Sequence, residues 1–204
     1  MKLTWHGHAC FTLQEEDYTI IIDPFRDVPG YDNICMEVNE AYASHQHYDH
    51  CYFDELTIRE KQDGIFQVKV VSSFHDAFHG EKRGTNRIHV FSAGQTKVVH
   101  LGDLGHVLND EQIAELKGCD VLLVPVGGNY TLDAEAAREV CSQLKPKLTV
   151  PMHYQRNGKG IASIADVEPF LNLNQEKRIL CSPDDSVDFS NPVSADILVM
   201  RWED

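Results

Sequence analysis

The sequence of residues 45–50, HQHYDH, places four side chains that can bind metal ions within six positions. His45 and His47 are two residues apart, so their side chains leave the same face of an extended backbone. Asp49 and His50 follow where the chain is expected to turn into a helix, so they can point to a different place. One tetrahedral ion cannot easily bind four ligands that are split into two pairs pointing to different places. The spacing therefore indicates two metal ions, about 3.5–4 Å apart in two-metal hydrolytic sites.

The segments around this run show alternating strand and helix patterns. Short runs rich in β-branched and aromatic residues predict strands at residues 2–5, 10–14, 18–22, 40–44, 66–73, 87–92, 96–101, 120–126, 148–152, 177–181 and 196–201. Residues 24–39 are expected to form a loop, because Pro and Gly interrupt them. Capping residues predict helices over 110–117 after Asn109 and over 132–144 after Thr131. Two further helices are expected over about 52–61 and near 163–172. This pattern indicates an α/β or α+β layer fold in one domain, residues 1–204.

The composition narrows the choice of partners. The 204 residues include 32 Asp and Glu against 18 Lys and Arg, a formal net charge of −14, so nucleic acid is not expected as a partner. No apolar run approaches the ~18 residues that span a bilayer, and the first residues lack the apolar core of a signal peptide. The six cysteines form no C-x-x-C pair. We therefore expect a cytoplasmic protein with a small-molecule substrate and no membrane partner; the sequence predicts no oligomeric state.

These motifs resemble those of the metallo-β-lactamase superfamily, whose binuclear hydrolases carry H-x-H-x-D-H at a strand end. The resemblance covers nearly the whole chain, from GHACF at 7–11 and IIDPF at 21–25 to VPMHY at 150–154. FHDAFHGEKRGTN, HLGDLGH and PVGGNYTLDAEAA make it especially similar to the small bacterial branch of metal-dependent hydrolases to which L-ascorbate-6-phosphate lactonase is related. The resemblance implies a four-layer αββα sandwich with the metal site at the edge between the two sheets.

The family pattern, carried over residue by residue, implies two metal ions with seven ligands. The implied ligands of the first ion are three histidines, His45, His47 and His75. Those of the second ion are Asp49, His50 and His153. Asp103 would bridge the two ions. His75, Asp103 and His153 each follow an expected strand, where a sheet can fix their positions. Neutral imidazoles with two carboxylates suit Zn²⁺ first, and the same set accepts Mn²⁺ or Fe²⁺.

Such a centre is expected to hydrolyse a substrate. Two divalent cations lower the pKa of a shared water enough to supply a bridging hydroxide near neutral pH. We expect this hydroxide to cleave an ester, lactone or phosphodiester, with Asp49 as the catalytic residue that moves the proton to the leaving group. The local charge of the ions would tolerate an anionic substrate. Two alternatives stay open: a non-haem iron oxidoreductase on the same fold, and a metal-binding protein without catalysis.

Two residues are expected to lie beside the metal ligands without binding an ion themselves. Asp23 ends an apolar strand and could fix the tautomer of a ligand histidine, or it could only cap the loop before Pro24. His8, in GHACF, is expected to pack or hydrogen-bond beside the metal site rather than to bind an ion.

Three further residues are candidates for substrate contact. Arg83 and Asn86 lie in the Gly-containing segment after His75 and could bind substrate oxygens, or they could serve the turn itself. His106, just past Asp103, could donate a proton or contact an oxyanion, or it could be a solvated loop histidine.

Overall fold

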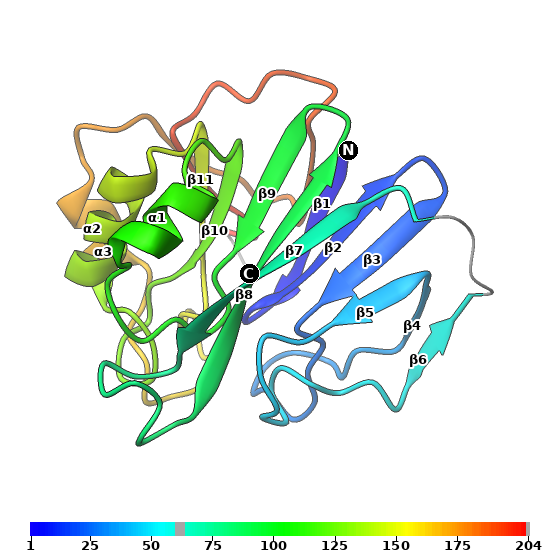
Figure 1. The fold of residues 1–204 in the computed structure, drawn as a ribbon, viewed down its shortest axis with the longest axis horizontal. Coiled ribbons are helices and arrows are strands. Elements are labelled where there is room, and N and C mark those ends of the chain that lie inside the picture. The colour runs from blue at the N-terminus through cyan, green and yellow to red at the C-terminus, as the bar shows by residue number, and fades with distance from the viewer. Residues whose placement is uncertain (60–63, 203–204) are drawn as a thin grey trace.

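A computed structural model describes residues 1–59 and 64–202 of the chain, and it places two β-sheets face to face (Figure 1). Five strands form the first sheet: β1 (Lys2–Gly7), β2 (Cys10–Glu15), β3 (Tyr18–Ile22), β5 (Glu40–Tyr42) and β13 (Ser186–Asp188). Their order is β13-β1-β2-β3-β5. β1, β2 and β3 are antiparallel neighbours, whereas β5 runs parallel to β3.

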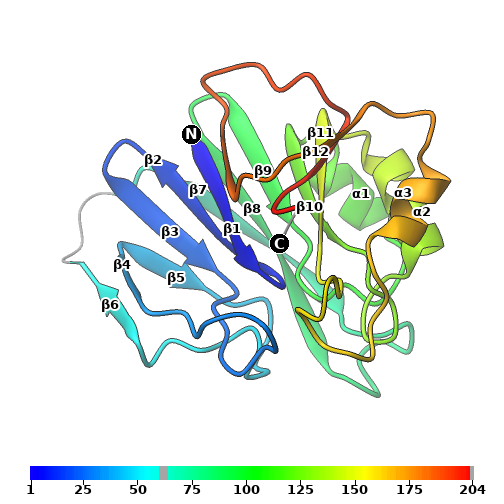
Figure 2. The ribbon, with the colours of Figure 1, turned by 180° about the vertical axis from the view of Figure 1, so that it is seen from behind.

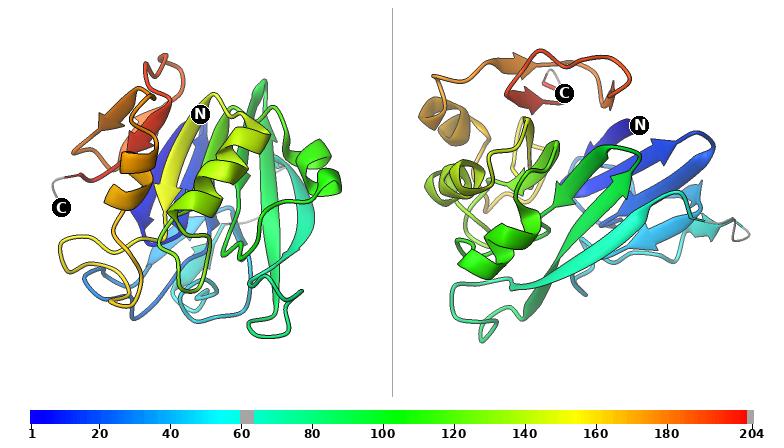
Figure 3. Two further views of the ribbon diagram at one scale, coloured as in Figure 1. Left: turned by 90° about the vertical axis from the view of Figure 1, so that its left-hand side faces the viewer. Right: turned by 45° about the horizontal axis from the view of Figure 1, so that its top comes forward.

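The second sheet carries the helices of the described chain on its outer face (Figures 2 and 3). Its strands are β7 (Gln67–Phe74), β8 (Thr85–Ala93), β9 (Thr96–His100), β10 (Val121–Pro125), β11 (Leu148–Met152), β12 (Ile179–Cys181) and β14 (Ile197–Val199), in the order β12-β14-β11-β10-β9-β8-β7. The helices are α1 (Asp110–Leu116), α2 (Ala134–Leu144) and α3 (Glu168–Leu173). β10 and β11 are buried along their whole length because the other sheet covers one face and helices cover the other.

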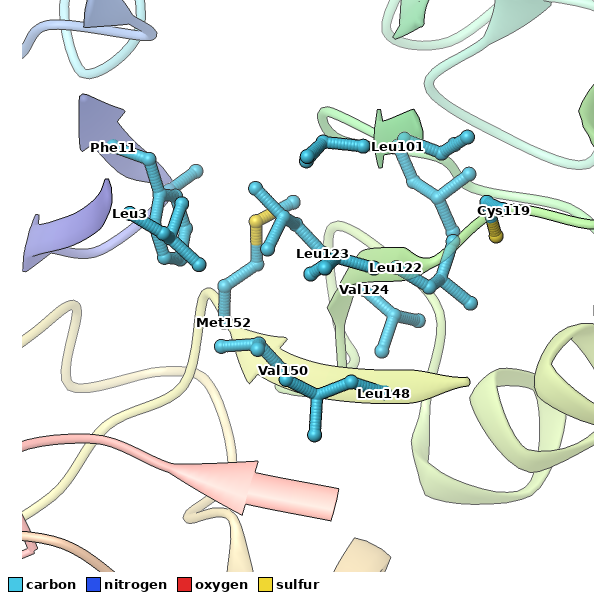
Figure 4. Close-up of a cluster of buried hydrophobic side chains, with 14 of the residues drawn as sticks. Leu3, Phe11, Leu101, Cys119, Leu122, Leu123, Val124, Leu148, Val150 and Met152 are labelled. Atoms are coloured by element: carbon cyan, nitrogen blue, oxygen red, sulfur yellow. The ribbon is translucent and has the colours of Figure 1, made fainter. Parts of the chain in front are cut away.

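The main hydrophobic core lies between the two sheets. Leu3 and Phe11 of the first sheet belong to the same cluster of buried side chains as Leu123 and Met152 of the second (Figure 4). All four side chains are fully buried, and full burial of a side chain of this size contributes about 1.5–3 kcal/mol. This core holds the two sheets together and fixes the loops at their edges.

A second, smaller core covers the outer face of the five-stranded sheet. Ile21 points away from the main core, as the period of two along a strand requires, and packs with Phe25 and Val38. Among the described residues, this outer layer consists of loop segments and a parallel pair of short strands, β4 (Met36–Val38) and β6 (Leu56–Ile58).

The structure confirms the sandwich and most of the expected strands. The sequence analysis missed β13, and the helix expected over 163–172 is α3, which begins only at Glu168. Three further differences concern residues 24–61 and the start of α2. The helix expected over 52–61 is wrong for residues 52–59, which contain β6; residues 60–61 lie outside the described residues. The loop expected over 24–39 contains β4, which is extended because it pairs with β6. The N-cap of α2 is Asp133 instead of Thr131, since the Asp133 carboxylate accepts the N–H of Ala136 at 2.9 Å.

No helix in residues 1–59 and 64–202 has the length and apolarity that crossing a bilayer requires; the longest of the described helices, α2, has 11 residues.

Candidate metal centre

The side chains expected to bind metal come from loops that follow strands of both sheets. His75 directly follows β7, Asp103 follows β9, and His153 directly follows β11. These three strands run in the same direction, so their ends meet at one edge of the sheet. On the other sheet, the loop after β5 carries residues 45–50, and β5 is parallel to β3. The fold therefore brings residues far apart in the sequence to one edge of the sandwich.

Asp103 lies at the centre of this cluster. Its Oδ1 atom is 3.2 Å from Nε2 of His50, and its Oδ2 atom is 3.2 Å from Nε2 of both His75 and His153. A longer distance of 3.9 Å separates Oδ2 from Nε2 of His45. One buried carboxylate thus contacts histidines of both expected ligand sets.

The structure brings the expected ligands into compact groups. In each group, one ligand atom per residue lies within 4.8 Å of the others. One group holds the three histidines expected for the first ion, His45, His47 and His75. Another holds the three residues expected for the second ion together with a fourth, and its members are Asp49, His50, His153 and His8. A third group links both sets through Asp103, His45 and His50.

Several of these atoms are buried without a hydrogen-bond partner. They are Nε2 of His45, His50 and His153, and Oδ1 of Asp103. Leaving a buried polar group unpaired costs about 1–3 kcal/mol, so native proteins rarely leave several together. These orphaned atoms are nitrogen and oxygen donors that converge on one region, and such a donor set fits divalent cations.

Asp23 holds two of the ligand histidines through hydrogen bonds. Nδ1 of His50 donates to Asp23 Oδ2 at 2.9 Å, and the Ser44 hydroxyl donates to the same oxygen at 2.7 Å. The Ser44 hydroxyl in turn accepts from Nδ1 of His45 at 3.0 Å. Because a carboxylate only accepts, both Nδ1 atoms carry a proton, and in the neutral imidazoles the lone pair lies on Nε2. Asp23 also accepts the Ser44 N–H, so the two roles weighed for it from the sequence coexist.

A backbone carbonyl orients His75 in the same way. Nδ1 of His75 donates to the carbonyl oxygen of Tyr130 at 3.0 Å, in the loop before α2. The Nε2 atom that faces Asp103 is therefore the one with the free lone pair. Three ligand histidines thus present Nε2 to the centre because their Nδ1 protons are held elsewhere.

Burial and neighbouring charges set the protonation of the centre. Burial lowers the pKa of His45 to about 3 and also lowers the pKa of His47, so both imidazoles are neutral at pH 7. Burial by itself would raise the pKa of Asp103, but His153 and His50 outweigh it and hold that pKa well below its usual range. The centre therefore offers the neutral imidazoles of His45 and His47 beside an ionised carboxylate. Asp103 and Asp23 outweigh burial and raise the pKa of His50 well above its usual value, so His50 would release a proton on binding a cation.

His8 lies beside the expected ligands, where its ring packs and hydrogen-bonds. Its Nε2 atom is 3.3 Å from Asp49 Oδ2, and its ring centroid is 4.0 Å from that of His153. Its carbonyl oxygen accepts the N–H of His153 at 3.0 Å. Both residues have a left-handed backbone, with φ of +52° for His8 and +53° for His153. Such strain in non-glycine residues is concentrated at functional sites.

Asn86 does not face a substrate, which differs from the sequence expectation. Its side-chain amide donates to Ser73 Oγ and to the carbonyl of Leu101, and its Oδ1 accepts the N–H of Asp103 at 3.0 Å. The side chain is 1% exposed. Asn86 therefore positions Asp103 from inside the protein.

His106 is also committed to the backbone. Its Nε2 accepts the N–H of Phe74 at 3.3 Å, and its Nδ1 donates to the carbonyl of Val107 at 2.9 Å. The expectation that His106 donates a proton to substrate or contacts an oxyanion is not supported, because neither ring nitrogen is free.

Asp76 is a supporting residue that the sequence interpretation missed. Its carboxylate accepts the backbone N–H groups of Phe78, Gly80, Lys82 and Arg83. These hydrogen bonds outweigh the opposing effect of burial and lower the pKa of Asp76 to about 2. The available signal was an Asp at the start of a Gly-containing loop, a position where Asp commonly binds backbone N–H groups.

Two hollows differ in their relation to this centre. One of about 200 Å³ opens beside His45 and His47, and its lining includes Arg83 and Arg87. A larger one of about 460 Å³ lies beside α2 and α3, and no expected metal ligand lines it. The smaller hollow is thus the one that adjoins the ligands.

Comparison with known proteins gives a consistent match. A family model described as the beta-lactamase superfamily domain matches residues 2–153. A UPF0173 protein of Pyrococcus furiosus is 30% identical, over 88% of this chain and 93% of the relative. A UPF0173 metal-dependent hydrolase of Thermoplasma acidophilum is 27% identical, over 76% of this chain and 83% of the relative.

A solved structure shares the fold over almost the full length. It is that of a candidate zinc-dependent hydrolase of the metallo-β-lactamase superfamily from Thermotoga maritima. The TM-score is 0.76 at 34% identity, and the match covers 98% of this chain and 97% of the other.

Proposed function

The chain belongs to the metallo-β-lactamase superfamily, and we propose that it is a metal-dependent hydrolase with two divalent cations. Zn²⁺ is the cation that we propose before Mn²⁺ or Fe²⁺. The observation that carries the two-ion proposal is the contact of one carboxylate, that of Asp103, with histidines of both ligand sets at 3.2 Å. A carboxylate between two groups of imidazoles suits a bridging ligand.

The proposed holders of each ion follow the groups found in the structure. His45, His47 and His75 would hold the first ion, and Asp103 would lie between the two. The second ion would be held by Asp49, His50 and His153, with His8 beside them.

When bound, the two cations would lower the pKa of a coordinated water and polarise the bond to be cleaved. The bond classes proposed are esters, lactones and phosphodiesters of small molecules. A relation to L-ascorbate-6-phosphate lactonase stays a prediction.

Asp49 is the residue proposed to move the proton. The hydrogen bond from His8 and the neighbouring His50 outweigh burial and hold the pKa of Asp49 below its usual range. The side chain is therefore a carboxylate at neutral pH, able to accept a proton from the attacking water and return it to the leaving group. His8 keeps the carboxylate in place from the interior side, with Nε2 at 3.3 Å.

The experiment is a panel of activated esters, lactones and phosphodiesters tested on the metal-loaded protein. We expect turnover of at least one class, loss of that turnover on chelation, and recovery with Zn²⁺. Asp103→Asn should abolish it, and Asp110→Asn should not, because Asp110 is an exposed residue in the first turn of α1. Turnover that survives Asp103→Asn would refute the proposal, as would one iron per chain with thiol-dependent oxygen uptake.

A further inference from the structure

The hollow beside the first ligand group is lined by two arginines from different segments. Arg83 belongs to the loop after His75, and Arg87 belongs to β8. His45 and His47 line the same hollow of about 200 Å³. A molecule bound at the metal ligands could therefore place one of its groups between these two arginines.

Arg83 is held in place by neighbours of a metal ligand. Its backbone N–H donates to the Asp76 carboxylate at 2.8 Å. Its guanidinium carbon lies 5.3 Å from the ring centroid of Tyr130, the residue whose carbonyl orients His75. Stacking of this kind restrains a guanidinium while leaving its N–H groups free to bind an anion.

Arg87 is anchored to the segment that begins the histidine run. Its backbone N–H donates to the carbonyl of Ser44 at 2.9 Å, and Ser44 immediately precedes His45. The Arg87 side chain is exposed, so its charge is available at the mouth of the hollow. Both arginines thus have hydrogen-bonded backbones, and Arg87 is exposed whereas Arg83 is half-buried.

Arg83 and Arg87 differ from the other arginines of the chain in having no carboxylate partner within the described residues. Each of the other six arginines lies within 4.0 Å of a carboxylate, and these are Arg26, Arg59, Arg138, Arg156, Arg178 and Arg201. Across residues 1–59 and 64–202, neither Arg83 nor Arg87 makes such an ion pair. In a chain with 32 acidic residues and a net charge of −14, two guanidinium groups that line one hollow without a carboxylate partner make that hollow a favourable place for an anion.

We propose that this hollow binds an anionic group of the substrate, a phosphate or a carboxylate, through Arg83 and Arg87. The assignment to a substrate rests on the proposed hydrolase function. Guanidinium groups match both oxyanions with paired N–H donors, so the shared chemistry is a terminal oxyanion. The scissile bond would lie at the ligand cluster, with the anionic group held in the hollow next to His45 and His47.

Calorimetric titration of the metal-loaded protein with inorganic phosphate, and separately with acetate, tests this proposal. We expect the wild type to bind at least one of the two anions. The variants are Arg83→Gln, Arg87→Gln and the double variant, with Arg59→Gln as the control because Arg59 lies at the end of β6 and pairs with Glu37. Each single variant should lose about tenfold in affinity, the double variant should lose more, and the control should be unchanged.

Metal content, measured in every variant, separates lost anion contacts from a damaged centre. The anion whose affinity falls more in the arginine variants is the one that the hollow prefers. Equal affinities in the double variant and the control would overturn the proposal, because the anion would then be bound elsewhere. Failure of the wild type to bind either anion would also overturn it. Arginine-dependent binding without any turnover would refute the hydrolase function alone. Turnover with arginine-independent binding would refute the anion site alone.

Discussion

The Asp23 carboxylate accepts a hydrogen bond from Nδ1 of His50 at 2.9 Å, and both side chains are completely buried. This contact fixes the proton on Nδ1 and turns Nε2 toward Asp103, 3.2 Å away. A residue that binds no metal itself thus determines which nitrogen of a ligand faces the centre. Asp23 also holds Ser44, and through it His45, so it touches the supports of both ligand groups.

Asp23→Asn should weaken metal binding. An amide keeps the size of the side chain but loses its charge and one acceptor oxygen, so it cannot hold both His50 and Ser44 as the carboxylate does. Loss of such an outer hydrogen bond typically reduces metal affinity about 10–100-fold. Equilibrium dialysis against Zn²⁺ measures this, with Asp120→Asn as the control because Asp120 accepts from Lys97 away from the centre. Unchanged affinity in Asp23→Asn would contradict the role given to Asp23.

Gly127→Ala should disturb the loop that carries His153. A Cβ at this position would lie 2.2 Å from the carbonyl oxygen of His153, a backbone atom that cannot move independently. Overpacking of this kind costs about 1–3 kcal/mol of the free energy of unfolding, and here it would also shift a ligand. We expect lower metal content together with a lower melting temperature. Gly64→Ala is the matched control, since its Cβ would meet nothing nearer than 3.4 Å; equal behaviour of the two variants would refute the explanation.

Asn86→Leu should act on the metal centre and not on substrate affinity alone. The substitution keeps a similar volume but removes the acceptor of the Asp103 N–H and leaves that buried donor unpaired. An unpaired buried donor costs about 1–3 kcal/mol, so urea unfolding should show a loss of this size. Metal analysis should show reduced occupancy. A raised KM with full metal content and unchanged stability would instead support the substrate contact predicted from the sequence.

His89 should make the stability of the fold depend on pH. Burial lowers its pKa from 6.5 to about 4, and its ring packs against Tyr42 and Phe91. Between these two values the unfolded chain binds a proton that the folded chain excludes. The stabilising effect is therefore complete above pH 6.5 and is lost as the pH falls toward 4, with about 2 kcal/mol lost between pH 7 and pH 5.

Urea unfolding of the wild type and of His89→Phe at both pH values measures this effect. Phe keeps the ring and cannot take up a proton, so the variant should lose less stability on acidification by about the same 2 kcal/mol. Equal pH dependence of the two proteins would show that folding does not lower the pKa of His89.

Local sequence patterns predicted most of the fold. The strands at Tyr18–Ile22 and Val121–Pro125 are almost entirely apolar, and such short runs are typical of buried strands. The strands Met36–Val38 and Leu56–Ile58 were missed because each has three residues and is extended only through pairing with the other, 20 positions away. Capping of α2 was misplaced by two positions, since Thr131 and Asp133 are both good N-cap types.

The sequence indicates those candidate ligands that lie together in one local motif. It does not indicate contacts between residues of the two sheets. Residues 45–50 form a metal-binding motif that is visible in the sequence. A potential ligand directly after an expected strand can also be recognised there. The proximity of Arg87 to Ser44 depends on how β8 of one sheet lies against the loop after β5 of the other, which no local pattern records. The role of Asn86 was missed for another reason, since its partner Asp103 follows the next strand of the same sheet, 17 positions away.

Metal stoichiometry tests the central claim of a two-ion centre most directly. The measurement is elemental analysis of the protein purified without chelators and saturated with Zn²⁺, compared with Asp103→Asn. We predict two tightly bound ions per chain in the wild type and at most one in the variant, because the Asp103 carboxylate contacts histidines of both groups. One ion per chain in the saturated wild type, or two ions held equally tightly by Asp103→Asn, would contradict it.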